Sequence, residues 1–327
     1  AFIDMLKRDV FPLLPKEAFF GPKLTAFDSS YKAYGIKTSK DPLWKEIVKQ
    51  VKQLKDDTSI QFGDPIVLEV DKNGKEIFLD PKEIWSLRTQ YDKLFKSPQV
   101  IEKNIENNEI AKFNKQVAAI HKVLWARIKD SIKDTKGVSA TGIATYLGFV
   151  ASDTGHWHKL GAQMVGYSKK INTYRNNKGE LKKARYEYEH AMPATAAYLY
   201  LLDAALASVT DGVSFESAYD LVIDNYKLIA LDKAMDNKLV NARTERGYSL
   251  QRRMPDNWDL IKDRWLDRYF NDIVMAQDGG INPESIIALN GKTFAEEYGI
   301  SFSKVPEFAN FDKNNTIQKA IQFSKNT

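Results

Sequence analysis

The 327-residue sequence contains no cysteine, which excludes disulfide bonds, thiolate metal sites and a cysteine nucleophile. Long apolar runs are also missing. No segment approaches the ~18 consecutive apolar residues that a membrane-spanning helix needs, so we expect no membrane span. An excess of one charge is absent too: 48 basic residues face 43 acidic ones. The resulting net charge of +5 does not by itself indicate a nucleic-acid-binding protein.

The sequence does have the apolar and aromatic side chains that a packed core needs. Apolar residues make up 43% of the chain, and 17 Phe, 15 Tyr and 6 Trp are among them, which argues against disorder. Because apolar residues recur at helical spacing in several segments, we expect a mainly α protein with small β-hairpins, in the α+β class. The expected helices cover residues 42–54, 81–95, 98–132, 194–208, 215–225, 233–240 and 258–274.

Two turns separate pairs of extended segments. Asp71–Lys75 and Asn176–Gly179 each combine glycine with Asp or Asn, a pattern typical of β-hairpins. A further short apolar strand is expected over Lys227–Leu231. Beyond Lys136-Gly137 small residues become frequent, and we place a domain boundary there. The expected domains are residues 1–136, helical with one hairpin; 137–275, centred on His190; and 276–327, a C-terminal extension.

The best candidate for chemistry lies around His190. An extended segment with alternating aromatic and acidic residues ends in Glu189-His190, and Met192-Pro193 follows. Downstream come Asn225, the expected apolar strand Lys227–Leu231, and an expected helix that carries the polar candidates Asp236 and Asn237. This order resembles the His-Me finger, or HNH, nucleases. In that family a strand ends in Asp-His or Glu-His, an Asn begins a second strand, and the next helix supplies a third polar residue.

The resemblance implies a metal-dependent endonuclease with a ββα-metal element in the second half of the chain. His190 would be the general base, and Asn225 would orient its loop through backbone contacts. Glu189 and Asp236 or Asn237 would hold Mg²⁺ or another divalent cation. Such a reaction needs a base that activates water, for which a neutral histidine is suited. It also needs a hard cation on the scissile phosphate, held by oxygen or imidazole ligands.

Two departures from the family pattern leave alternatives open. The usual final histidine is absent, and the stretch between His190 and Asn225 is long enough for two helices. The site is therefore either an active nuclease or a decayed one, retained as a nucleic-acid-binding or structural module. A third interpretation has no site at all: His190 caps a helix and Asn225 ends one.

Basic residues lie on both sides of this motif in the sequence, and tyrosines are interleaved with the first group. Cations of this kind meet phosphates, while tyrosine rings stack on bases. The alternative is a solvated hairpin and loop, as most charge runs are. The residues expected to bind nucleic acid, DNA above all, are Lys178, Lys182, Lys183, Arg185, Arg252 and Arg253.

The remaining histidines are weaker candidates. His156 and His158 are two residues apart, a spacing that allows metal binding from a strand or loop but not from one helical face. Asp153 is a third potential ligand, yet a loop without metal is the favoured interpretation. His121 falls within an apolar helical stripe and is expected to be structural.

A second resemblance covers roughly residues 145–299. Its motifs are Glu189-His190-Ala191-Met192-Pro193-Ala194, Asp224-Asn225-Tyr226-Lys227, Met254-Pro255-Asp256-Asn257-Trp258, Trp265-Leu266-Asp267-Arg268 and Gly279-Gly280-Ile281-Asn282-Pro283. Together they resemble a segment of very large proteins of tailed marine phages. The resemblance implies phage origin, location in the virion or host cytoplasm, and other virion proteins as partners. The chain begins at Ala1, which is compatible with a processed fragment of a larger protein.

Two functions from different classes follow. The favoured one is a virion-associated protein with an HNH-like, decayed domain that binds nucleic acid. The alternative is an active endonuclease with His190 as general base. Convergence of His190, Asn225 and Asp236 or Asn237 on one point would favour the enzyme.

Overall fold

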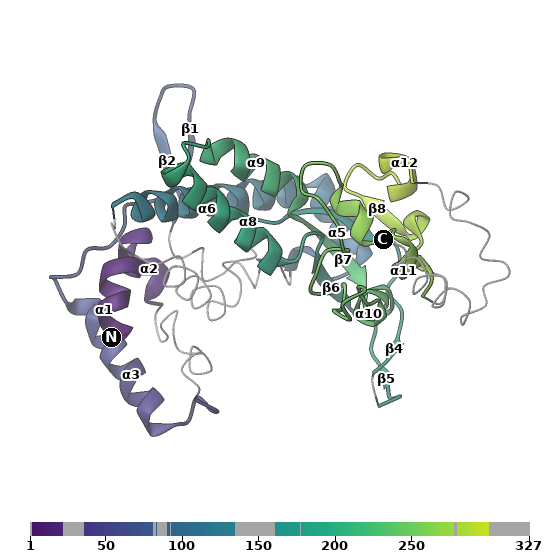
Figure 1. Cartoon of the computed structure of the whole chain (residues 1–327), viewed down its shortest axis with the longest axis horizontal. Coiled ribbons are helices and arrows are strands. Elements are labelled where there is room, and N and C mark those ends of the chain that lie inside the picture. The colour runs from purple at the N-terminus through teal and green to yellow at the C-terminus, as the bar shows by residue number, and fades with distance from the viewer. Residues whose placement is uncertain are drawn as a thin grey trace. The chain divides into compact units, whose positions relative to one another are not determined.

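The computed structural model describes residues 2–21, 36–80, 83, 90–91, 93–134, 161–176, 178–277 and 280–300. In these parts the chain is mixed α and β, with small sheets (Figure 1). It divides into two compact units, each assembled from three separate segments. Unit 1 comprises Ala1–Leu94, Asn108–Gln163 and Tyr198–Ile223; unit 2 comprises Phe95–Asn107, Met164–Ala197 and Asp224–Thr327. The expected boundary at Lys136-Gly137 and most of the helix expected over residues 81–95 lie outside the described residues.

Unit 1 is mostly helical. An aromatic cluster with Phe11, Phe19 and Phe62 packs its N-terminal part, and Arg127 donates to the carbonyl of Leu13 at 2.8 Å. Its elements are α1 (Phe2–Met5), a π-helical turn (Leu6–Val10), a 3₁₀ turn (Phe11–Leu13), α2 (Lys16–Phe19), α3 (Pro42–Gln53), a 3₁₀ turn (Leu54–Asp56), β1 (Val67–Val70), β2 (Glu76–Phe78) and α6 (Glu109–Asp134). Two further helices, α8 (Ala194–Thr210) and α9 (Phe215–Asn225), have residues in both units.

Local sequence explains two of these elements. The Asp41 carboxylate accepts a hydrogen bond from the amide of Leu43 at 2.9 Å and caps α3, whose first residue is the expected Pro42. The first predicted hairpin is confirmed, since β1 and β2 pair antiparallel around the turn at Asp71. Asp71 accepts from the amides of Asn73 and Lys75, and Gly74 adopts the left-handed conformation at φ +79°.

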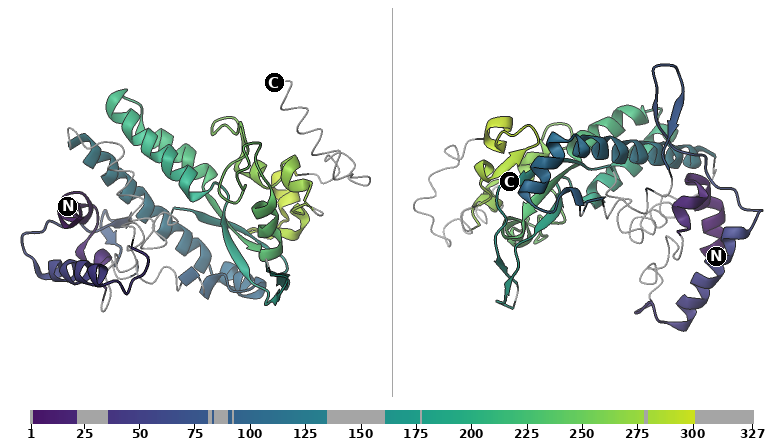
Figure 2. Two further views of the ribbon diagram at one scale, coloured as in Figure 1. Left: turned by 60° about the horizontal axis from the view of Figure 1, so that its bottom comes forward. Right: turned by 180° about the vertical axis from the view of Figure 1, so that it is seen from behind.

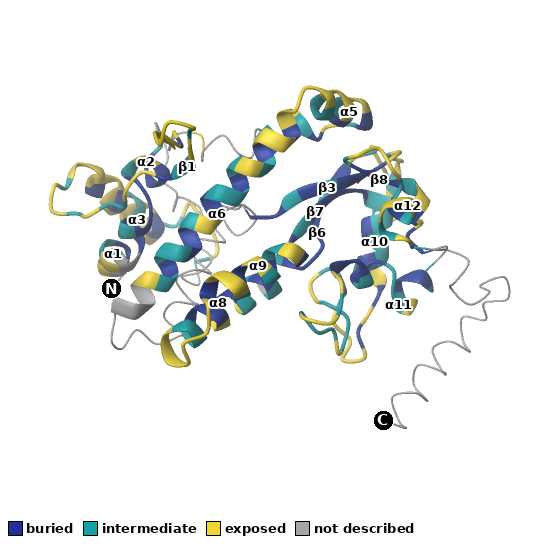
Figure 3. Cartoon of the chain, turned by 90° about the horizontal axis from the view of Figure 1, so that it is seen from above, coloured by how far each residue is buried: buried dark blue, intermediate teal, exposed yellow. Residues whose placement is uncertain are grey.

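Helix α6 carries the predicted apolar stripe. Val117, Ile120, Leu124 and Ile128 are buried, while other positions of the helix are exposed, as the blue and yellow stretches of α6 in Figure 3 show. Figure 2 shows the same long helix from two further sides. His121 lies in the same stripe and is buried, as expected of a structural residue. The helix expected from residue 98 is interrupted: α5 (Pro98–Glu106) ends before α6, and Asn108 between them has φ +59°.

Unit 2 is built on a four-stranded sheet in the order β6-β7-β3-β8. The strands are β3 (Gln163–Ser168), β6 (Tyr186–His190), β7 (Lys227–Asp232) and β8 (Ile286–Ala288). The predicted strand after Asn225 is thus confirmed, and it pairs antiparallel with β6 so that His190 faces Leu228. Strands β3 and β8, which pair antiparallel, were not predicted. Figure 3 shows β3, β6 and β7 mostly buried.

Small helices and loops pack against this sheet and form the core of unit 2 with it. This core includes Ile229 and Leu231 of β7, together with Trp265, Tyr269 and Phe294. Gly166 in β3 is required by this packing, because a Cβ there would lie 2.4 Å from the ring of Phe294. The other elements of unit 2 are α10 (Lys233–Asn241), a 3₁₀ turn (Trp265–Arg268), α11 (Asp272–Met275), a 3₁₀ turn (Pro283–Ser285) and α12 (Phe294–Tyr298).

The second predicted hairpin is confirmed at its turn, with different strands. β4 (Tyr174–Arg175) pairs with β5 (Leu181–Lys182), and Asn176 Oδ1 accepts from the amides of Lys178 and Glu180. The strands of this hairpin were expected over Ile171–Tyr174 and Ala184–Tyr188. Of the second segment, Tyr186–Tyr188 belong to β6 and pair with β7 instead. Figure 1 shows β4 and β5 extending away from the sheet of unit 2.

The helix expected over residues 258–274 is wrong. Turns, the 3₁₀ turn Trp265–Arg268 and the short α11 occupy this stretch. The reason is local: Asp259 Oδ1 accepts from the amides of Ile261 and Lys262, and such side chains compete with helical backbone bonds. Separately, none of the helices in the described ranges is long and apolar enough to cross a membrane.

Candidate functional site

Two of the predicted site residues, Glu189 and His190, lie at the end of β6, a strand that contacts β7 and α10. Helix α10 follows β7 directly, begins at the cap Asp232, and contacts both strands. Glu189 and His190 are the last residues of β6 and are 9% and 7% exposed. The imidazole of His190 stacks on the ring of Tyr226, with centroids 5.5 Å apart and an interplanar angle of 23°. The His190 ring is therefore packed against the buried Tyr226.

A buried arginine contacts the end of β6. Arg268 is 0% exposed, and its guanidinium donates to the Glu189 carboxylate and to the carbonyl of His190. It also donates to three other carbonyls, those of Ala191 (3.1 Å), Leu250 (2.7 Å) and Gln251 (2.8 Å). Arginine remains charged even when buried, so Glu189 has a permanent cationic partner.

Asp236 is the second buried carboxylate here, with 1% exposure. Lys233 donates to it at 2.5 Å, and Gln251 Nε2 lies 3.4 Å from each of its oxygens. Burial raises the pKa of Glu189 to about 7; Arg268 opposes this shift, while the charge of Asp236 and a hydrogen bond to it reinforce the shift. The charge of Asp236 thus acts on Glu189 inside unit 2.

These carboxylates do not fit a divalent cation as they stand. Each already binds a cationic side chain, Glu189 through Arg268 and Asp236 through Lys233, and those charges repel a metal ion. Within the described ranges, no group of three or more His, Asp or Glu is arranged to hold a metal. The segment with His156, His158 and Asp153 lies outside those ranges.

The other two predicted site residues have different surroundings. Asn225 ends α9 and is 7% exposed, and its Oδ1 accepts from the amide of Trp265 at 3.0 Å. It therefore fixes the start of the turn that carries Arg268. Asn237 lies one residue after Asp236 in α10 and is half-buried. The structure brings Glu189 close to Arg268 and Asp236, whereas the imidazole of His190, the next residue of β6, stacks on Tyr226. Successive side chains of a strand point to opposite faces, so the two predicted residues do not face one point.

Sequence reasoning missed Arg268, whose guanidinium binds Glu189 and the carbonyls of His190 and Ala191. Arg268 falls within the helix expected over residues 258–274, and the sequence assigns it no role there. One signal was present: Trp265, Leu266, Tyr269 and Phe270 surround it with apolar side chains. A charged residue in such a run is a candidate for a buried ion pair.

The predicted nucleic-acid-binding residues are all exposed: Lys178, Lys182, Lys183, Arg185, Arg252 and Arg253. Lys182 pairs with Glu180 at 2.8 Å and Arg185 with Glu187 at 2.5 Å, but such exposed pairs are weak in water. In the described parts of the chain, no carboxylate pairs with Lys178, Lys183, Arg252 or Arg253. Segment 168–185, called the basic hairpin below, has seven basic residues and one acidic residue.

The base of the basic hairpin is anchored to the sheet. Tyr186 donates to the carbonyl of Ser168 at 2.7 Å, and the Ser168 hydroxyl accepts from the amide of Asp232 at 2.8 Å. Asn172 donates to the carboxylate of Asp232 at 2.7 Å. These contacts attach both ends of the basic hairpin to the end of β7 and the start of α10. The lysines and arginines of the hairpin therefore extend from an anchored base.

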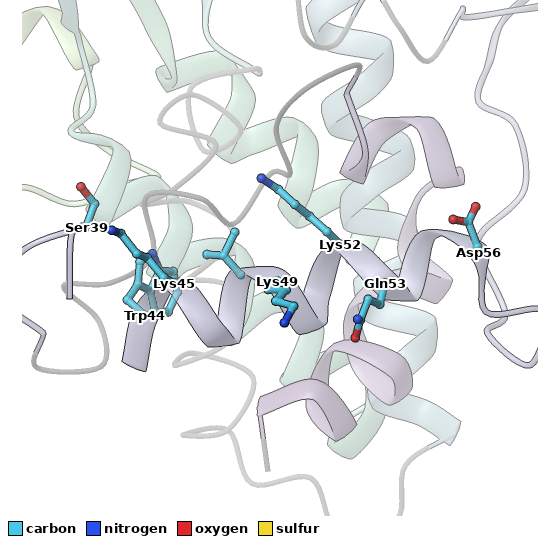
Figure 4. Close-up of a pocket in the computed structure, with 8 residues that line it drawn as sticks. Ser39, Trp44, Lys45, Lys49, Lys52, Gln53 and Asp56 are labelled. Atoms are coloured by element: carbon cyan, nitrogen blue, oxygen red, sulfur yellow. The ribbon is translucent and has the colours of Figure 1, made fainter. Parts of the chain in front are cut away.

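A pocket of about 540 Å³ lies along α3 in unit 1 (Figure 4). Trp44 forms part of its wall, and Lys45, Lys49 and Lys52 are spaced along the same helix. None of the predicted site residues lines it. No family model matches the chain, and the comparisons with curated proteins and with solved structures give no match either.

Proposed function

We propose that unit 2 is a nucleic-acid-binding module of a phage virion protein, and that it binds without cleaving. The observation that carries the binding proposal is the basic hairpin, whose exposed cations extend from an anchored base. Phosphate contacts by such cations release counterions and dominate the affinity of non-specific binding. The phage and virion part rests on the sequence resemblance, with other virion proteins as partners.

Arg268 is the reason to expect binding without cleavage. Its guanidinium supplies the positive charge that the family resemblance assigns to Mg²⁺, and it is held by Glu189 and four carbonyls. A metal ion would have to displace a buried, fully hydrogen-bonded cation, and that exchange is costly. In this proposal Glu189, His190 and Asp236 support the fold beneath the hairpin.

The test measures binding of a fluorescein-labelled DNA by the full chain at several salt concentrations. We expect Kd to rise steeply with salt, and Lys178/Lys182/Lys183→Glu to weaken binding and reduce the salt slope by roughly 2–3. The matched control is Lys45/Lys49/Lys52→Glu, which changes the net charge equally at three exposed lysines of α3. Equal losses in both variants, or no binding by the native chain, would overturn the proposal.

An active endonuclease is the second candidate, and one observation favours it. β6 ends in Glu189-His190 and pairs with β7, and the helix after β7, α10, contacts both strands and carries Asp236. The HNH resemblance implies this order of strand, strand and helix. The discriminating experiment incubates the chain with plasmid DNA and RNA in Mg²⁺ or Mn²⁺. Cleavage that His190→Ala abolishes, with DNA binding intact, would establish the enzyme and contradict the non-catalytic proposal.

A further inference from the structure

Tyr248 is the only exposed aromatic side chain among the described residues of unit 2, and 54% of it faces solvent. Its loop is well ordered by hydrogen bonds. Arg243 and Ser249 form a β-bridge, and the amide of Thr244 donates to the carbonyl of Tyr248 at 2.8 Å. The hydroxyl of Ser249 binds the last turn of α10. The Tyr248 ring is thus exposed to solvent on a loop that hydrogen bonds hold in place, and it does not contribute to the core.

One arginine contacts this ring, and two more lie close to it in the sequence. The guanidinium carbon of Arg253 lies 5.3 Å from the ring centroid, within cation–π range, and Arg246 and Arg252 are exposed nearby in sequence. Segment 241–253 has four basic residues and one acidic residue. Tyr174 and Arg185 on the basic hairpin form a second pair of this kind, at 5.6 Å. Aromatic rings and cations therefore occur together on two separate elements of unit 2.

We propose that unit 2 selects single-stranded nucleic acid, with a base stacked on Tyr248 and the adjoining phosphates bound by Arg252 and Arg253. This inference rests on the proposed function and specifies its substrate. A base in a duplex has both faces covered by its neighbours, whereas a single strand offers a free face to an exposed ring. The combination of a stacking ring and phosphate-binding cations matches that chemistry, because every base has such a face.

The experiment compares binding of the full chain to a labelled single-stranded DNA, the RNA of the same sequence, and the matching DNA duplex. The native chain should prefer the single strands. Tyr248→Ala should weaken single-strand binding by about 5- to 150-fold, as expected for the loss of one stacked base. It should leave the salt slope unchanged, because no phosphate contact is lost. The DNA and RNA arms distinguish the two sources of single strand.

Two variants serve as controls. Tyr248→Phe keeps the ring and should retain native affinity, while Ile261→Ala removes an apolar side chain that is 79% exposed in the same unit and should have no effect. Equal affinity for single strands and duplex, unaltered by Tyr248→Ala, would sink this inference and leave the proposed function standing. Absence of binding to all three probes would sink both.

Discussion

Arg268 and Glu189 form an ion pair inside unit 2, although 79 positions separate them in the sequence. The pair connects the end of β6 to the turn Trp265–Arg268, and the same guanidinium reaches Leu250 and Gln251. A single side chain thus ties three segments of the chain together.

Arg268→Met should destabilise the protein by about 3–5 kcal/mol, because it leaves a buried carboxylate and several carbonyls without their donor. Denaturation in urea, followed by circular dichroism, gives the free energy of unfolding. Adding Glu189→Gln to the variant should restore part of the loss, since the uncompensated charge is then gone. Arg252→Met, at an exposed position, should stay within about 0.5 kcal/mol of the native chain. A harmless Arg268→Met would refute the structural role of the pair.

Gly166→Ala should cost about 1–3 kcal/mol, because the new methyl group would meet the ring of Phe294. Thermal unfolding of the variant measures the loss. Phe294→Leu makes room at the same contact, so the double variant should lose less than the sum of the two single losses. Strict additivity would mean that the two residues do not meet as described.

The stability of the native chain should fall with acid between about pH 6.5 and 3 because of His121. Burial lowers the pKa of His121 from 6.5 to about 3, so in this range the unfolded chain takes up a proton that the folded chain refuses. Each unit of pH in the window removes up to about 1.4 kcal/mol. The imidazole is held neutral in the fold: Trp125 donates to Nε2 at 3.1 Å, so Nδ1 carries the proton toward the Tyr219 hydroxyl, 2.7 Å away.

The matched variant for this prediction is His121→Gln, which cannot titrate. Unfolding free energies of both proteins are measured from pH 7 to pH 4 at constant ionic strength. The native chain should lose stability relative to the variant as the pH falls, whatever the other histidines contribute to both. Parallel curves would show that His121 is not the residue responsible.

Asp232→Ala should cost about 1–2 kcal/mol, the upper range for loss of an N-cap. Asp232 is 1% exposed, caps α10 through the amide of Ala234 at 3.1 Å, and accepts from Asn172 of the basic hairpin. Asp232→Asn keeps one accepting oxygen and should retain more of the stability. Hydrogen exchange should show faster opening of α10 and of residues 169–173 in the alanine variant. Unchanged protection there would contradict the anchoring role.

Much of the local structure was predictable because it depends on neighbouring residues. The turn at Asp71, the turn at Asn176 and the cap of α3 at Asp41 each use side-chain oxygens that bind amides two to four positions away. The strand Lys227–Asp232 contains the continuous apolar run Leu228–Leu231, and the helices α8 to α10 follow their predicted ranges closely. The contact of α10 with β6 and β7 was likewise anticipated from the order strand, strand, helix.

What the sequence by itself determined, then, are the contacts between residues close in the chain: turns, caps and apolar periodicity. Only the tertiary structure decided that β3 and β8 complete the sheet of unit 2, and that Tyr186–His190 pairs with β7 instead of returning along the hairpin. Only the tertiary structure decided that Arg268 is buried against Glu189. The physical reason is that strand pairing and ion-pair burial depend on partners far along the chain, and the free energy of those contacts exists only once the core has closed around them.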